Sequence, residues 1–109
     1  MITVEFNVTE TEVTVIKKSD KLTSGNVEQI QCVFNLSDAY KELTVRAVFN
    51  GKFRTVEDGK CYAPELEEGR CKIGVYAYSI ENEKTVLRIS PTPCIEYVSK
   101  GTYLSLIHI

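Results

Sequence analysis

The sequence lacks most of the residues that common catalytic sites need. It contains no tryptophan and one histidine among 109 residues. That histidine, His108, is next to the last residue, so a Ser-His-Asp or Cys-His arrangement would depend on a chain end, and chain ends are poorly held. The six glycines stand singly, without the pattern of a phosphate-binding loop. We therefore expect no catalytic residue and no enzymatic activity.

Charge and hydrophobic runs also exclude classes of partner. Thirteen basic residues stand against fifteen acidic ones, so no basic excess is present to neutralise the phosphates of a nucleic acid. No apolar run approaches the roughly 18 residues that a bilayer span requires. The N-terminus shows neither a basic segment nor an apolar core of a secretory signal. We expect no nucleic-acid partner, no membrane insertion and synthesis in a cytoplasm.

The cysteines lack the spacing of a metal site. No two are close enough to form the C-x₂₋₄-C half of a zinc site, and the three aspartates fall in predicted turns. If oxidised, the cysteines could pair in three ways, but the absence of an export signal favours free thiols. We expect no metal and no cofactor, with free thiols at Cys32, Cys61, Cys71 and Cys94.

What the sequence does contain predicts an all-β fold. Val, Ile and Thr are abundant and Ala is scarce, which favours pleated strands over helices. Apolar residues alternate in segments such as Ile2–Val8 and 30–36, where Cys32 falls on the apolar face. About nine short strands separated by turns predict a β-sandwich, and the chain length favours an immunoglobulin-like Greek-key type. We expect one short helical crossover at 37–42, where helix formers follow Ser37.

Two glycines predict local geometry. Asn50-Gly51 supplies the positive φ angles of a type I′ hairpin, whose two-residue loop would place Val45 opposite Val56. Gly74 interrupts a predicted strand at 73–78, which indicates a bulge or a close backbone approach.

Tyr76 and Tyr78 are the candidate interaction residues. Their i, i+2 spacing places both rings on one face of a strand. Exposed tyrosines could stack on sugars or anchor a protein interface. The alternative is that they cover the edge of the core while their hydroxyls reach water. A carbohydrate-binding or other β-sandwich binding module is therefore one functional hypothesis.

A series of short motifs resembles the N-terminal domain of tail and baseplate structural proteins, of the baseplate upper protein type, from phages and prophages of Gram-positive bacteria. The matching segments, with a looser match over 2–36, are Arg46–Phe49, Cys61–Glu65, Lys72–Ala77, Leu87–Pro93 and Val98–Tyr103. The resemblance implies an immunoglobulin-like domain of the virion tail, made in the bacterial host cytoplasm. It also implies assembly with other tail and baseplate proteins and, in the full-length protein, with copies of itself. It supplies no catalytic residue.

The two ends of the chain carry further expectations. We expect the sandwich domain to span 1–103, and the strand Ile2–Val8 to form a sheet edge available for assembly. Residues 104–109 can be encoded by CTG TCT CTT ATA CAC ATC, which resembles the end of a transposase-based sequencing-library adapter. We expect this tail to be an artefact of a truncated gene, with a genuine final strand as the alternative.

Overall fold

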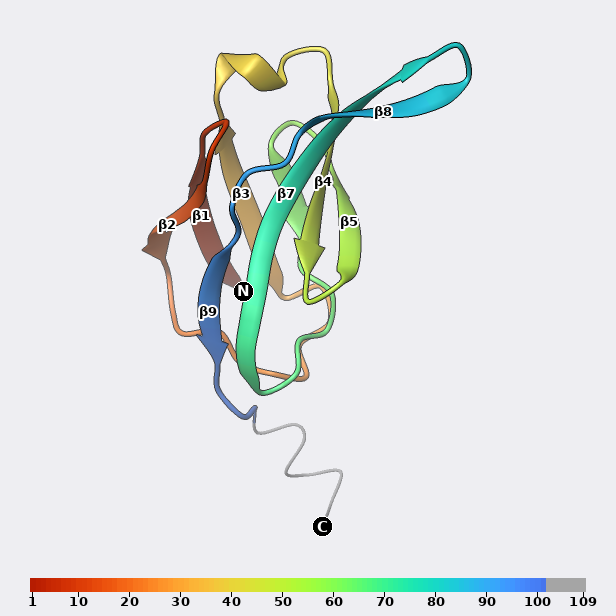
Figure 1. The fold of residues 1–109 in the computed structure, drawn as a ribbon. Coiled ribbons are helices and arrows are strands. Elements are labelled where there is room, and N and C mark those ends of the chain that lie inside the picture. Colours follow the sequence, from red (N-terminus) through yellow and green to blue (C-terminus); the bar gives the residue numbers. More distant parts are fainter. Residues whose placement is uncertain (102–109) are drawn as a thin grey trace.

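The computed structural model describes residues 1–101, which form two β-sheets packed face to face (Figure 1). The all-β prediction is confirmed, and the nine strands alternate with turns along the chain. Their bounds are β1 Ile2–Val8, β2 Val13–Lys18, β3 Ile30–Leu36, β4 Thr44–Phe49, β5 Lys52–Val56, β6 Lys60–Tyr62, β7 Gly69–Glu81, β8 Lys84–Ile89 and β9 Cys94–Val98. None of the helical segments within 1–101 has the length and hydropathy of a membrane span.

The first sheet has the strand order β2-β1-β3-β6, and the second has the order β5-β4-β7-β8 with β9 also paired to β7. Strand β1 pairs antiparallel with β2 and parallel with β3. The prediction that Ile2–Val8 forms a sheet edge is therefore wrong. Its backbone groups are used on both sides, because β2 folds back as a hairpin and covers the side that β3 leaves free.

The connection from β3 to β4 carries the chain from one sheet to the other. The predicted helical crossover is only a single 3-10 turn, Asp38–Tyr40, because Lys41 already leaves the helical region with a ψ of 140° and Glu42 follows with a positive φ of 64°. Tyr40 is buried, and its hydroxyl donates a hydrogen bond to the Thr9 carbonyl at 2.7 Å. This bond ties the crossover to the turn between β1 and β2.

The core lies between the two sheets and is built from the alternating apolar residues of both. Phe6 and Phe34 stack at 4.8 Å between ring centroids in the first sheet, and Phe49 lies fully buried in the second. Cys32 is also fully buried, as its place in the alternation predicts. Burying apolar side chains of this kind stabilises a fold by about 1.5–3 kcal/mol each.

The Asn50-Gly51 hairpin forms as predicted. Val45 pairs with Val56 and Phe49 with Lys52, and the two loop residues have φ angles of 48° and 88°. Both angles are positive, as a type I′ turn requires.

Strand β7 is the longest, with 13 residues, and it organises the second sheet. Its first half pairs with β9 and its second half with β8, while β4 covers the other side. Beyond Tyr78 no partner from β4 remains, so β7 and β8 continue as a two-stranded arm that projects from the body (Figure 1).

Candidate functional site

The outer face of the second sheet gathers the aromatic residues that the sequence points to. In β4 the buried residues are Val45, Ala47 and Phe49, so the alternation turns Arg46 outward. Arg46 lies directly opposite Tyr76 of β7. Cross-strand neighbours share a face, which adds further outward side chains from β5 and β8. We call this set the aromatic face: Arg46, Phe53, Tyr76, Tyr78, Ile80 and Leu87.

Arg46 is the centre of the aromatic face. Its guanidinium carbon lies 4.7 Å from the Phe53 ring centroid and 5.3 Å from that of Tyr78. Both distances are within the range of a cation–π interaction. A hydrogen bond with the Tyr76 side chain is the main cause that raises the pKa of Arg46 above its ordinary value. The guanidinium group is therefore charged at every physiological pH.

One donor of Arg46 has no acceptor within residues 1–101. Its Nε atom is buried without a hydrogen-bond partner. A buried unpaired donor is costly, and such donors are uncommon in native proteins.

The two predicted tyrosines lie together but differ in access. Their ring centroids are 6.0 Å apart. Tyr78 is only 8% exposed, and the Arg46 guanidinium lies over its ring. Tyr76 is half-buried. The most accessible apolar groups of this face are instead Phe53, Leu87 and Ile80, with exposed fractions of 52%, 60% and 68%.

Sequence reasoning missed four members of this face, which are Arg46, Phe53, Ile80 and Leu87. A signal was present for one of them: Arg46 follows the same alternation that places Val45 and Ala47 in the core, and Asn50-Gly51 fixes its partner strand. Leu87 carries no such signal, because a bulge between Ala77 and Tyr78 shifts the register of β8.

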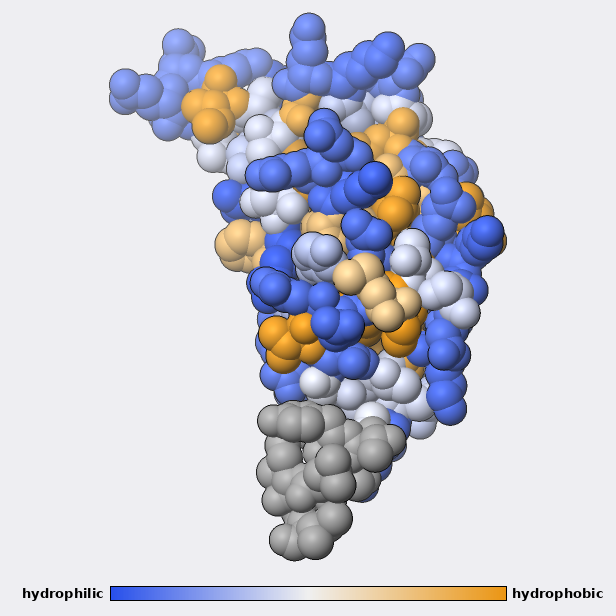
Figure 2. All heavy atoms as spheres, turned by 180° about the vertical axis from the view of Figure 1, so that it is seen from behind, coloured by the Kyte–Doolittle hydropathy of each residue, from blue (hydrophilic) through white to orange (hydrophobic). Residues whose placement is uncertain are grey.

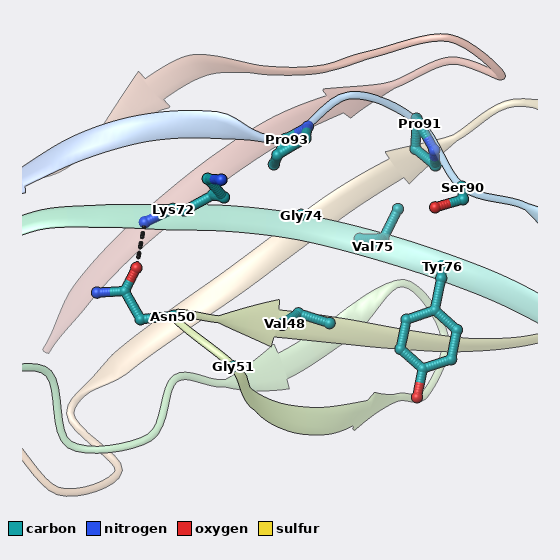
Figure 3. A pocket seen from close by; sticks show the side chains of 10 residues that line it. All are labelled: Val48, Asn50, Gly51, Lys72, Gly74, Val75, Tyr76, Ser90, Pro91 and Pro93. Carbon is teal, nitrogen blue, oxygen red and sulfur yellow. Dashed lines mark hydrogen bonds between the residues drawn. The ribbon is translucent and has the colours of Figure 1, made fainter.

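A hollow of about 520 Å³ adjoins the aromatic face at Tyr76 (Figure 3). Figure 3 shows Pro91 and Pro93 on one side of β7 and Val48 and Asn50 on the other. A Cβ atom at Gly74 would lie 3.0 Å from Cβ of Pro93, so the glycine allows the linker before β9 to pack on the strand. The predicted close approach at Gly74 is therefore confirmed. The size of the hollow is within the range of small-ligand pockets.

The opposite side of the molecule differs in character. In the rear view of Figure 2, hydrophilic side chains dominate and hydrophobic ones form separate spots. The outward residues of β1 include Thr3, Glu5 and Asn7, which explains this polarity. The aromatic face carries three exposed apolar side chains, Phe53, Ile80 and Leu87, and exposed apolar patches commonly mark interaction sites.

The four cysteines are free thiols. Within the part of the chain that the structure describes, no three His, Cys, Asp or Glu side chains are grouped so that they could hold a metal ion. His108 and the proposed artefactual tail 104–109 lie outside the described residues, as does Tyr103 at the predicted domain end.

The aromatic, aliphatic and guanidinium groups of this face are suited to binding. Tyr and Arg are enriched at the centres of protein interfaces, where they contribute strongly to affinity. Searches against protein-family models, curated proteins and solved structures found no match to this chain.

Proposed function

We propose that this chain is a non-catalytic structural domain of a phage or prophage tail baseplate, located in the virion tail and assembled there through the aromatic face. The observation that carries the proposal is the arrangement of Arg46 between Phe53 and Tyr78, bordered by exposed aliphatic groups. The partners are other tail or baseplate proteins and copies of this chain in the full-length protein. The motif resemblance supplies the tail context, and the aromatic face supplies a surface of the right chemistry.

We also propose that the sandwich is of the immunoglobulin-like Greek-key type. In such domains strands B and E pair in one sheet, while strand F lies between C and G in the other. The pairs β3–β6, β4–β7 and β7–β9 follow this pattern. Two features depart from this pattern within residues 1–101. Strand β1 runs parallel to β3, and β2 lies beside β1 while no strand takes the place of strand D beside β6.

The decisive test is incorporation into tail particles. Particles induced from a bacterium that carries this gene should contain peptides of the chain in fixed stoichiometry with known tail proteins. Leu87→Glu places a charge on the aromatic face and should reduce incorporation about tenfold, which corresponds to about 1.4 kcal/mol of lost binding energy.

The matched control is Ile16→Glu. Ile16 has a similar exposed fraction, 54%, but belongs to β2 in the other sheet. This variant should be incorporated normally. Particles that lack the chain would refute the tail function, while equal effects of both variants would refute the assignment of the aromatic face.

A second candidate function is glycan binding at the hollow beside Tyr76. The hollow combines the Tyr76 ring with polar groups of Asn50, Lys72 and Ser90, a mixture suited to a sugar. Because Tyr78 is nearly buried, a sugar would stack on Tyr76 alone. A glycan array should then show binding that Tyr76→Ala abolishes and that Tyr97→Ala, a change at an exposed β9 residue, leaves intact.

A further inference from the structure

Two cysteines face each other across the edge of the first sheet. Cys32 of β3 and Cys61 of β6 are direct partners in the antiparallel register. Ala63 donates a ladder hydrogen bond to Ile30 at 2.9 Å, and hydrogen-bonded pairs recur every second residue, so Cys32 and Cys61 also form such a pair. The Cα atoms of such pairs are about 5.5 Å apart, within the range that a disulfide spans.

The two thiols differ in access. Cys32 is fully buried, whereas Cys61 is partly exposed and lines a hollow of about 490 Å³ between β5 and β6. Two basic residues, Arg54 and Lys60, and three acidic ones, Glu28, Glu57 and Glu65, also line this hollow. Because Cys32 is fully buried, a small reagent that enters this hollow meets Cys61 first.

The two thiols also differ in acidity. The interaction with Cys32 lowers the pKa of Cys61, and the Arg54 charge acts in the same direction. The same interaction raises the pKa of Cys32, and burial raises it further. Burial raises the pKa of Cys94 to about 11 and also raises that of Cys71. Cys61 is therefore the best nucleophile of the four, since the thiolate is the reactive form.

We propose that Cys61 and Cys32 form a redox-active thiol pair that reacts with a low-molecular-weight disulfide such as oxidised glutathione. The Cys61 thiolate attacks one sulfur of that disulfide, its S–S bond breaks, and one glutathione leaves as a thiolate that takes up a proton. Cys32 then loses its proton and attacks Sγ of Cys61, which releases the second glutathione. Two protein thiols are oxidised to one disulfide, and one small-molecule disulfide is reduced to two thiols.

The order of attack follows from the coupling between the two thiols. While Cys61 is a thiolate, its hydrogen bond with the Cys32 thiol is the main cause that raises the pKa of Cys32, and the charge of Cys61 acts in the same direction. Once Cys61 is bound to glutathione, the thiolate is gone and both of these causes are removed, while burial remains. The pKa of Cys32 then falls, and the second step can proceed.

The product would fix the short strand β6 to β3. Strand β6 has only three residues and forms one edge of its sheet. A bond that closes a loop of about 30 residues restricts the unfolded chain and should raise the melting temperature by at least about 5 °C, where strain does not offset it.

The test is oxidation of the intact chain with oxidised glutathione at neutral pH, followed by thiol counting and peptide mass mapping. We expect two thiols to disappear, no glutathione adduct to remain, and one linked peptide pair that contains Cys32 and Cys61. The variant Cys94→Ala should behave like the unmodified chain and serves as the matched control.

Two variants separate the steps. Cys61→Ser should leave the remaining thiols unreacted, and Cys32→Ala should stop at a stable adduct on Cys61. If Cys32→Ala fails to fold, the mapping of the unmodified chain decides alone. Reaction at Cys71 or Cys94 in the folded chain, or no loss of thiols under conditions that oxidise a free dithiol, would overturn the proposal.

Discussion

Removing the hydroxyl of Tyr40 should destabilise the fold through one defined hydrogen bond. Tyr40 is 4% exposed, and its hydroxyl donates to the Thr9 carbonyl at 2.7 Å across a sequence separation of 31 residues. Tyr40→Phe deletes this donor and leaves the ring in place. The Thr9 carbonyl then loses its partner beside the crossover between the sheets.

The expected cost follows from the desolvation of that carbonyl. An ordinary hydrogen bond contributes about 0.5–1.5 kcal/mol, and a buried group left unsatisfied costs about 1–3 kcal/mol. We expect Tyr40→Phe to lower the free energy of unfolding by about 1–2 kcal/mol. In a domain of this size that corresponds to a fall of about 5–10 °C in melting temperature. The control Tyr97→Phe, at an exposed tyrosine of β9, should change the free energy of unfolding by less than about 0.5 kcal/mol.

The same residue predicts a pH dependence. Burial raises the pKa of Tyr40 from 10.0 to about 12, because the ionised form is poorly solvated there. A pKa raised in the folded state stabilises the fold below the unfolded value and loses this effect as pH rises towards the folded value. The advantage of the unmodified chain over Tyr40→Phe should thus be constant up to about pH 9 and shrink between pH 10 and 12.

Urea denaturation followed by circular dichroism at several pH values measures both the loss of stability in Tyr40→Phe and its dependence on pH. Equal stability of the two chains at neutral pH would refute the hydrogen-bond argument. A constant difference up to pH 11, with both chains still folded, would refute the assigned pKa direction and leave the hydrogen bond in place.

Four further substitutions test the packing and the hairpin by the same assay. Phe49→Ala should cost about 3–5 kcal/mol because the ring is fully buried, whereas Phe53→Ala at the exposed outer surface should cost less than about 1 kcal/mol. Gly74→Ala should cost about 1–3 kcal/mol, since the added methyl lies 3.0 Å from Pro93. Asn50→Ala should cost about 1–3 kcal/mol, because its side chain bonds two backbone groups of β7 at 2.7 and 3.1 Å and its φ is positive.

Local patterns in the sequence predicted the strands and one turn well. The alternation in Ile2–Val8 predicted the bounds of the strand that the structure confirms. The Asn50-Gly51 pair predicted the turn, and the structure has the register of a two-residue loop, which the partial match of the two faces had left open. The length of β7 was underestimated: 73–78 was predicted, but the strand extends from Gly69 to Glu81. The ends of β7 contain the charged residues Arg70, Lys72 and Glu81, which are typical of loops as well as of strands with one face in water. The charged ends were therefore not recognised as part of the strand.

Strand neighbours could not be predicted from the alternation. The pattern of Ile2–Val8 shows which side of the strand is buried but not which strands lie beside it, so the edge assignment failed. The exposure of the candidate site residues could not be predicted either, because it depends on which strands lie side by side. The spacing of Tyr76 and Tyr78 fixes their common face, yet the burial of Tyr78 depends on Arg46 from a strand about 30 residues earlier.

The parallel pairing of β1 with β3 has a consequence for the order of folding during synthesis. The β1–β2 hairpin is translated first, but its partner β3 begins only at Ile30, and the facing sheet needs β7, which ends at Glu81. Until β7 has been translated, the facing sheet cannot form, and no core is present that could bury Val4, Phe6 and Val8. Because most of this fold depends on pairing between distant segments, we expect slow folding and a nascent chain that benefits from chaperones until β7 has left the ribosome.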